Sequence, residues 1–350
     1  MAASRRKTEQ ADDDGLMTMT ELAQARTELA KELGMDLLFG DDEKLKLKKL
    51  PLGIATLDKA LSGGFAYDRV TLIIGQFSAG KTVLAMLTMR AAQLLGQSVA
   101  FIDVEKTWTP EWAEQLGIKA ADVIVIRPPS GEKAFDAAVA LVRRKVGVVV
   151  IDSLAALRAT AEIDVDIEEM FEKQFVGTVA KLVGRGLTMI ENENKGTLVL
   201  CINQIREKPG VSYGSPETIP GGKAQEFVAW QIVRVRRGEW ILDGTRRIGY
   251  MLKISVQKNK QGAPWQEAQV PFYFTGDIDE VAGIVEVGLE TEVIRQKGAK
   301  YWIKIGVDDD GQVVEREFYG RSNLIEAVRS DAELKSILEA SIDAIEQLEV

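Results

Sequence analysis

The segment Gly75–Thr82 has a composition and spacing suited to binding phosphate. Its two glycines stand five positions apart and are followed directly by a lysine and a threonine. Glycine lets the backbone turn its N–H groups toward phosphate oxygens, the lysine adds positive charge, and a threonine hydroxyl can bind Mg²⁺. We therefore expect the segment to bind a nucleoside triphosphate. Its residues are Gly75, Gln76, Phe77, Ser78, Ala79, Gly80, Lys81 and Thr82.

The residues on either side of this loop predict the elements that must hold it. Val70–Ile74 is an apolar, β-branched run typical of a buried strand, and apolar residues recur with helical spacing after Thr82. A helix N-terminus also attracts anions. The order strand, loop, helix therefore favours a phosphate site over a chance glycine turn.

Three later apolar runs end in polar residues that phosphoryl transfer could use. Asp152 follows Val148–Ile151 and could orient Mg²⁺, whereas Glu105 lies just beyond another such run and could orient an attacking water. Gln204 ends the third run and could sense a γ-phosphate, because its amide both donates and accepts hydrogen bonds. A capped turn or a solvated strand end is the ordinary alternative for each.

The segment after Gln204 is basic and rich in glycine, and it contains an aromatic residue. Such a loop can order around a polyanion and place a side chain against bases, although an ordinary flexible lid has a similar composition. The candidate residues for binding a polyanion here are Arg206, Lys208, Pro209, Tyr213 and Lys223.

Composition excludes several classes of protein. The 350 residues contain no histidine, which excludes histidine-based catalysis, and the single Cys201 leaves no disulfide framework, which fits a cytoplasmic location. No apolar run approaches the roughly 20 residues that span a bilayer, so we expect no membrane partner. The net charge of −9 argues against a passive nucleic-acid coat but allows a local basic groove.

The pattern along the chain predicts three parts. Residues 1–50 comprise a polar start expected to be disordered, a helix at 18–34 and a charged linker, and they could form an oligomerisation arm or dock on their own core. Residues 51–275 alternate strands and helices, which indicates an α/β core with a doubly wound, mostly parallel sheet. Residues 276–350 predict a small α+β domain.

Within the core, apolar runs predict five strands and a later hairpin. The hairpin has Ile232–Val235 and Tyr250–Val256 as its arms, and Asp243-Gly244 is the turn signal between them. The five strands are predicted at 70–74, 99–103, 123–126, 147–151 and 198–202.

Taken in order, these motifs resemble those of the bacterial RecA recombinases and their phage-encoded relatives. The resemblance runs from about Leu52 to the C-terminus, with gaps at 163–177 and 237–247. Its most specific pieces are Phe101–Glu105, Ile151–Leu157, Ile202–Arg206, and Pro216–Thr218 with Gly221-Gly222. Next in specificity is Lys258–Lys260 followed by Pro264.

The resemblance implies a RecA-like P-loop ATPase core that forms a helical filament on DNA, with ATP between neighbouring subunits. By position, Lys81 and Thr82 would hold phosphate and Mg²⁺, Asp152 would support the metal, and Glu105 would activate water. Gln204 would link the γ-phosphate to the DNA-binding loop.

The resemblance assigns further roles across the subunit boundary and around the base. Lys258 and Lys260 would act on the neighbouring subunit's nucleotide, and Trp112 and Phe274 would lie near the adenine. Segments 163–177 and 206–222 would face DNA. The chain departs from the family pattern in the acidic and longer first loop, and at Gln76-Phe77, Pro209 and Glu226.

The predicted function is ATP-dependent homologous pairing and strand exchange, with single-stranded and homologous double-stranded DNA as partners and ATP and Mg²⁺ as cofactors. One alternative is a RecA-like ring ATPase, such as a helicase motor, an oligomeric signalling ATPase or a recombination mediator without strand exchange. Another is a non-catalytic, nucleotide-gated DNA-binding protein, which Glu105 argues against.

Overall fold

The computed structural model describes residues 17–163, 177–207, 217–307 and 312–348. The chain divides into a unit at Met1–Leu47 and a unit at Lys48–Val350. Residues 1–15, which we expect to be disordered, lie outside the described residues. The first predicted DNA-facing loop, 163–177, also lies outside them except for its two end residues. No described helix has both the length and the apolar character needed to cross a membrane.

The N-terminal unit contains the predicted helix, α1 (Met19–Leu33), and a short 3₁₀ turn, η1 (Glu43–Leu45). A reciprocal capping box begins α1: the Glu21 amide donates to the Thr18 hydroxyl and the Thr18 amide donates to the Glu21 carboxylate. Gly34 ends the helix with φ of +65°. None of the α1 side chains is buried within what the structure describes.

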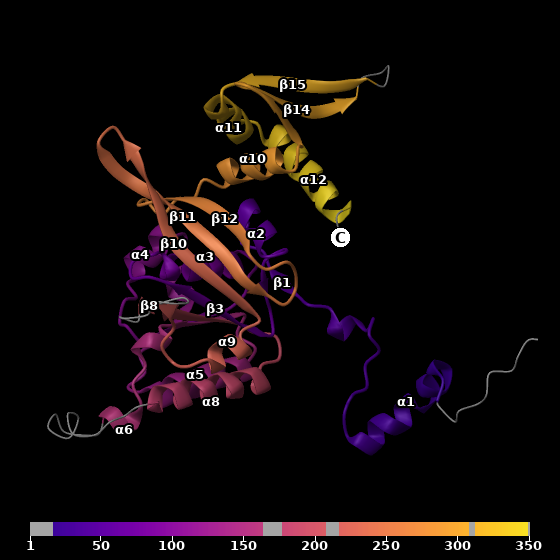
Figure 1. Ribbon diagram of the computed structural model, residues 1–350, viewed down its shortest axis with the longest axis vertical. Helices are drawn as coiled ribbons and strands as arrows, with labels where there is room; N and C mark the ends of the chain where they lie inside the picture. The colour runs from indigo at the N-terminus through magenta and orange to yellow at the C-terminus, as the bar shows by residue number, and fades with distance from the viewer. Residues whose placement is uncertain (1–16, 164–176, 208–216, 308–311, 349–350) are drawn as a thin grey trace, which may run out of the picture. The chain divides into compact units, whose positions relative to one another are not determined.

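The second unit is built on an eight-stranded sheet (Figure 1). Strands β10, β3, β7, β6, β4 and β5 are parallel, and β11 and β12 extend the sheet in antiparallel fashion. The five predicted strands lie within two residues of the observed ones at each end. In spatial order the strands are β12 (Gln266–Tyr273), β11 (Arg246–Asn259), β10 (Gln231–Asp243), β3 (Arg69–Gly75), β7 (Leu198–Gln204), β6 (Val148–Asp152), β4 (Val99–Asp103) and β5 (Val123–Ile126).

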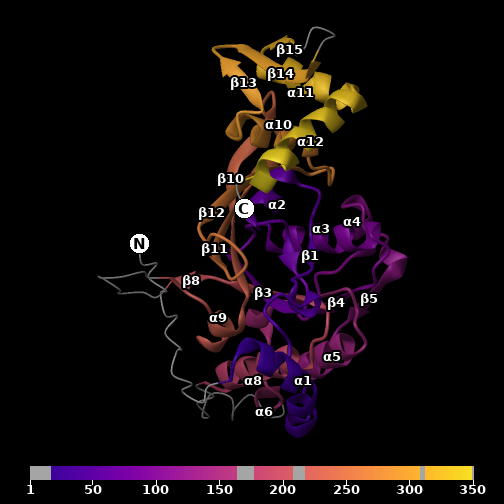
Figure 2. The ribbon, with the colours of Figure 1, turned by 90° about the vertical axis from the view of Figure 1, so that its right-hand side faces the viewer.

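Helices cover both faces of this sheet, as expected for a doubly wound fold (Figures 1 and 2). One face packs against α2 (Ala55–Ala60), α3 (Lys81–Leu94) and α4 (Pro110–Gln115). The other packs against α5 (Gly131–Arg143) and α8 (Thr178–Glu193).

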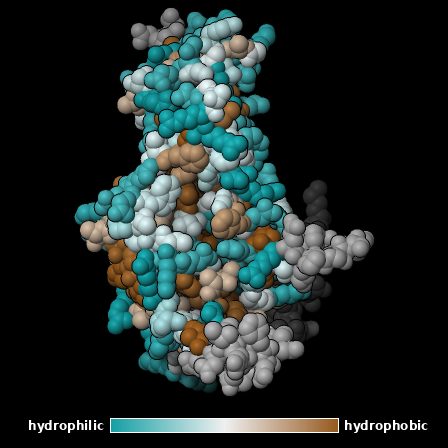
Figure 3. All heavy atoms as spheres, turned by 90° about the vertical axis from the view of Figure 1, so that its left-hand side faces the viewer, coloured by the Kyte–Doolittle hydropathy of each residue, from teal (hydrophilic) through white to brown (hydrophobic). Residues whose placement is uncertain are grey.

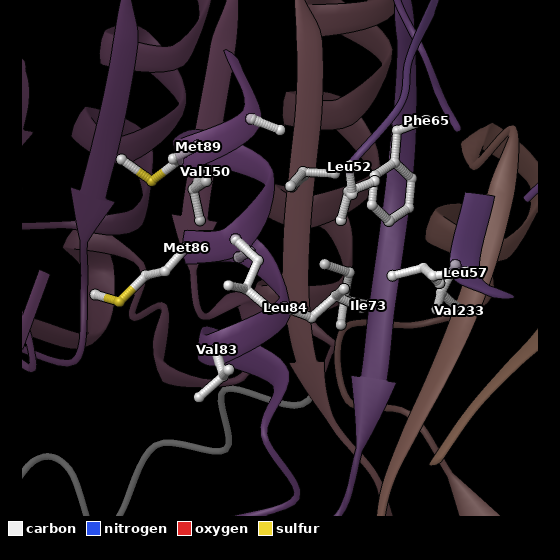
Figure 4. Close-up of a cluster of buried hydrophobic side chains, with 14 of the residues drawn as sticks. Leu52, Leu57, Phe65, Ile73, Val83, Leu84, Met86, Met89, Val150 and Val233 are labelled. Carbon is white, nitrogen blue, oxygen red and sulfur yellow. The ribbon is translucent and has the colours of Figure 1, made fainter. Parts of the chain in front are cut away.

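Side chains along each strand alternate between the two cores. In β3, Ile73 belongs to the core under α3, whereas Leu72 and Ile74 belong to the core under α5 and α8. Figure 4 shows the first of these cores, in which Leu84 of α3 lies beside Ile73 and Met86 points to another part of the cluster. Both cores are apolar, so the sheet is buried on both faces and holds its loops rigidly.

The hairpin formed by β10 and β11 is longer than predicted. Its arms pair from Gln231↔Asn259 to Asp243↔Arg246, and Gly244 has φ of +59° at the turn. The residues added at 236–243 are mostly charged or glycine and include a short apolar group, Trp240–Leu242, so they form no continuous apolar run. Figure 3 shows the side toward which the hairpin tip points in Figure 1, where apolar and near-neutral residues interrupt the hydrophilic surface.

The C-terminal segment contains a three-stranded antiparallel sheet and three helices around its own apolar core. An ion pair between Arg90 and Glu280, 2.9 Å apart, joins it to α3. The elements are α10 (Glu280–Glu290), β13 (Ile294–Lys297), β14 (Lys300–Val307), β15 (Val313–Tyr319), α11 (Arg321–Ser330) and α12 (Ala332–Leu348).

Short elements complete the core, including the small sheets β1–β2 and β8–β9. They are β1 (Lys49–Leu50), β2 (Phe65–Ala66), η2 (Ala120–Asp122), η3 (Leu154–Ala156), α6 (Thr160–Ile163), β8 (Arg206–Glu207), β9 (Glu217–Thr218) and α9 (Ala224–Val228).

Candidate functional site

The predicted phosphate loop joins β3 to α3, as the sequence pattern requires. Gly80 caps the helix with φ of +98°, a conformation that favours glycine, and Gly75 packs so closely that a Cβ would collide with the Val235 carbonyl oxygen. Both glycines are therefore needed to bring the loop against the β10–β11 hairpin.

Lys81 begins α3 and is only 7% exposed. Its ammonium group donates a 2.7 Å hydrogen bond to the Gln76 carbonyl oxygen across the loop. Burial lowers the pKa of Lys81, and the carboxylates of Asp152 and Glu105 oppose that shift. A phosphate in the loop would add a strong counter-charge next to this buried cation.

Thr82 and Asp152 meet beside the loop. The Thr82 hydroxyl donates a 2.7 Å hydrogen bond to the carboxylate of Asp152, which ends β6 and is 3% exposed. Burial raises the pKa of Asp152 to about 6, although the hydrogen bond from Thr82 acts in the opposite direction and lowers this pKa.

The donor set of this pair fits Mg²⁺, which binds one or two protein oxygen atoms and completes its shell with water and phosphate. The described residues hold no group of three or more histidine, cysteine, aspartate or glutamate side chains that could cage a metal without a nucleotide. Thr82 and Asp152 are thus the residues that would hold the ion.

Glu105 lies beyond β4, next to the end of β6. The Ser153 hydroxyl donates a hydrogen bond to the Glu105 carboxylate, and the Gln204 amide lies 3.5 Å from the same oxygen atom. The ends of three neighbouring parallel strands thus bring Glu105, Asp152 and Gln204 together. The sequence interpretation treated Ser153 only as part of a motif and gave it no role, although its place directly after Asp152 could have suggested one.

Asp103 holds the turn that carries Glu105. Its carboxylate accepts a 2.8 Å hydrogen bond from the Thr107 amide and forms a 3.0 Å ion pair with Arg127. Because Asp103 is 1% exposed, this charge is compensated inside the protein. The sequence interpretation treated Asp103 only as part of a motif and did not include Arg127.

A pocket of about 380 Å³ opens beside the phosphate loop. The predicted adenine neighbours Trp112 and Phe274 both line it. Three aromatic residues that the sequence interpretation did not include complete its wall: Trp240, Tyr250 and Phe272. Flat apolar walls next to a phosphate loop suit the base and ribose of a nucleotide.

A buried polar network connects the end of β7 to the predicted DNA-binding loop. The Asn203 amide donates to the Pro220 carbonyl oxygen (2.8 Å) and to the Gln225 side chain (2.7 Å). Gln225 in turn donates to the carbonyl oxygen atoms of Pro220 (2.6 Å) and Gly222 (2.9 Å). Residues 220–222 are therefore fixed directly beside Gln204.

The predicted DNA-binding residues fall into two groups. Arg206 is exposed in β8, which pairs with β9, and the exposed Lys223 precedes α9. Lys208, Pro209 and Tyr213 lie outside the described residues. Where the loop returns to the sheet, Arg234 of β10 holds Glu217 of β9 with hydrogen bonds of 2.7 and 2.5 Å.

Lys258 and Lys260 do not lie with the other predicted catalytic residues. Lys258 pairs with Ile232, which pairs with Leu72 of β3. Gly75, where the phosphate loop begins, is three residues further along β3, about 10 Å at the usual rise per residue. Lys258 therefore lies two strands across the sheet from β3, level with the middle of that strand and not with the phosphate loop that follows it.

Each of the two lysines has a partner where it lies. Lys258 donates hydrogen bonds to the carbonyl oxygen atoms of Glu226 (2.7 Å) and Phe227 (3.3 Å). Burial is the main cause that lowers the pKa of Lys258, and the positive charge of Lys260 lowers this pKa further. The ammonium group of Lys260 is 5.3 Å from the centre of the Trp230 ring.

Comparison with known proteins identifies the family. A family model described as the RecA N-terminal domain matches residues 20–279, more than half of the chain. A relative named Protein RecA from Frankia alni is 36% identical over 324 residues, covering 91% of this chain and 90% of its own length.

Two further relatives carry the same name. Protein RecA from Nocardioides sp. is 36% identical and covers 88% of this chain and 86% of its own length. Protein RecA from Thermus thermophilus is 35% identical and covers 92% of this chain and 93% of its own length. With this identity over nearly its whole length, the chain belongs to the RecA family.

Proposed function

We propose that this protein is an ATP-dependent recombinase that assembles on single-stranded DNA, pairs it with homologous double-stranded DNA and exchanges strands. The observation that carries the proposal is the meeting of Lys81, Thr82, Asp152, Glu105 and Gln204 at one edge of the sheet. This arrangement couples a nucleotide site to the loop that leaves β7.

For hydrolysis, each residue contributes through its position. Lys81 and the loop N–H groups would bind the β- and γ-phosphates, and Glu105 would orient water and accept its proton. Ser153 holds Glu105 in place through its hydroxyl hydrogen bond. Mg²⁺, bound by Thr82 and Asp152, would neutralise charge on the phosphate oxygens.

We further propose that the complete site forms between two copies of the chain. Within its own chain, Lys258 is held by the carbonyl oxygen atoms of α9 and Lys260 lies over Trp230, so neither ammonium group is directed to the phosphate loop by a contact in the described residues. A role for them in hydrolysis therefore requires a second copy, which would place them against the γ-phosphate as cationic groups.

DNA binding is proposed for the loop between β7 and α9. Arg206 and Lys223 lie at the two ends of this loop, and Lys208, Pro209 and Tyr213 lie within it. Gln204 contacts the Glu105 side of the nucleotide site, so a change in that loop can reach the catalytic carboxylate through one side chain.

One experiment tests the proposal directly. ATP hydrolysis is measured with and without single-stranded DNA, and the same samples are viewed by electron microscopy. We expect DNA to stimulate hydrolysis and filaments to form on it; equal rates and no filaments would contradict the proposal.

Strand exchange between homologous substrates separates a recombinase from the ring-ATPase alternative. The alignments with the RecA relatives cover 91% and 92% of this chain, so they must include part of the C-terminal segment. This shared segment favours the recombinase over the ring ATPase.

A further inference from the structure

The hairpin segment in which the sequence resemblance has a gap, residues 237–247, contributes to the wall of the nucleotide pocket. Two of its residues, Arg237 and Trp240, line the pocket together with the phosphate loop, Trp112 and Phe274. The hairpin therefore brings an additional large aromatic side chain to the site.

Neighbouring rings fix the indole of Trp240. Its ring centre lies 6.2 Å from that of Tyr250, with the planes 86° apart, and 6.4 Å from that of Phe274. Both distances are within the range of favourable aromatic pairs. Trp240 thus belongs to the same aromatic wall as Phe274, which the family resemblance places near the adenine.

Two arginines also hold Trp240. The guanidinium carbon atoms of Arg237 and Arg247 lie 4.7 and 4.5 Å from the centre of the Trp240 ring. Both are within the distance at which a cation is attracted to the face of an aromatic ring. The contacts restrict the indole and place positive charge next to a pocket that would receive a polyanion.

We propose that Trp240 is a positioning and specificity-determining residue of this site, whose indole contacts the base of the bound nucleotide. The inference rests on the proposed function, since it takes the neighbouring loop to bind the triphosphate. A purine offers a larger face than a pyrimidine to an aromatic side chain. Trp240 should therefore strengthen the binding of purine nucleotides more than the binding of pyrimidine nucleotides.

The test compares Trp240→Ala and Trp240→Phe with the wild type and with a matched control. Trp302 of β14 is also half-buried and also has an arginine over its ring, with the Arg295 guanidinium carbon at 4.8 Å. Because Trp302 lies in the C-terminal sheet, Trp302→Phe controls for the general loss of a tryptophan. Thermal unfolding first establishes that each variant is folded.

Binding is measured by competition against a fluorescent ATP analogue, with ATP, CTP and inorganic tripolyphosphate as competitors. We expect Trp240→Ala to weaken the binding of ATP roughly 5- to 150-fold, which corresponds to the free energy of an aromatic–base contact. The binding of CTP should weaken less than that of ATP. The binding of tripolyphosphate should be unchanged, because tripolyphosphate has no base. Trp240→Phe should recover most of the ATP affinity, and Trp302→Phe should resemble wild type.

Two results would overturn the inference while leaving the proposed function intact. One is unchanged ATP affinity in a folded Trp240→Ala variant; the other is an equal loss for ATP and tripolyphosphate, which would mean that the residue only shapes the phosphate loop. If the wild type binds neither ATP nor tripolyphosphate, the proposed function itself fails, and the inference fails with it.

Discussion

Gln225 provides a sharp test of how the predicted DNA-binding loop is coupled to the nucleotide site. Its side chain is 1% exposed and takes part in three hydrogen bonds: two to the carbonyl oxygen atoms of Pro220 and Gly222, and one from Asn203. Asn203 precedes Gln204, whose amide lies 3.5 Å from Glu105. Gln225 therefore fixes the end of the loop to the strand that carries the proposed sensor.

The substitution Gln225→Leu keeps a similar volume but removes all three hydrogen bonds. A neutral hydrogen bond contributes about 1 kcal/mol, and a buried polar group left without a partner costs about 1–3 kcal/mol. The Gly222 carbonyl loses its side-chain donor, whereas Asn203 and Pro220 keep their mutual bond. We expect unfolding to become easier by about 3 kcal/mol, with a specific loss of DNA-stimulated hydrolysis.

The assay combines urea unfolding with ATP hydrolysis measured with and without single-stranded DNA. Gln231→Leu is the matched control, because Gln231 is also fully buried but bonds to Ala66, Thr71 and Gly64 instead of the loop. Gln231→Leu should also lose stability, but by less than Gln225→Leu, because the hydrogen bonds of Gln231 are long, at 3.3–3.4 Å. It should keep the stimulation of hydrolysis by DNA.

The reasoning would be refuted if Gln225→Leu were stimulated by DNA as strongly as wild type, since the network would then carry no coupling. It would also be refuted if Gln231→Leu lost stimulation in proportion to its stability. That outcome would show that stimulation depends on global stability and that the anchoring of residues 220–222 is not the cause.

Three further predictions concern the proposed catalytic and DNA-binding residues. Glu105→Gln should bind ATP and DNA but hydrolyse about 10²–10⁴-fold more slowly, and near-normal turnover would place the base elsewhere. Lys258→Ala should recover part of its hydrolysis when mixed with Lys81→Ala, because neighbouring copies can then rebuild a complete site; no recovery on mixing would argue against a site between subunits. Substituting both Arg206 and Lys208 should weaken DNA binding equally for all sequences and reduce its salt dependence, and unchanged affinity across a salt titration would place the DNA path elsewhere.

The sequence predicted the sheet well because its parallel strands are buried on both faces. Such strands appear as continuous apolar runs, and 148–151 and 198–202 are almost entirely aliphatic. Polar residues at the ends of these runs stand out for the same reason. Asp152 and Gln204 could therefore be identified as candidates before the order of the strands was known.

The parts that the sequence interpretation did not include depend on pairings between distant segments. Ser153 matters because β4 and β6 are neighbours, and Gln225 matters because α9 returns to the end of β7. Trp240 lies on a polar arm whose length is set by pairing with Arg246–Tyr250. Local patterns contain no information about strand neighbours or register, so these contacts could only be found in three dimensions.

The positions of Lys258 and Lys260 indicate how hydrolysis can be made to depend on assembly. Within one chain, Lys258 is bonded to the carbonyl end of α9 and Lys260 lies over Trp230. The helix α9 begins directly after the loop that is proposed to bind DNA. If a neighbouring nucleotide draws Lys258 away, the end of α9 loses its cation, and the change reaches the loop through this short helix. Under the proposed assembly, the same lysine would link a neighbour's nucleotide to the proposed DNA-binding loop of its own chain, in addition to the proposed path through Gln204.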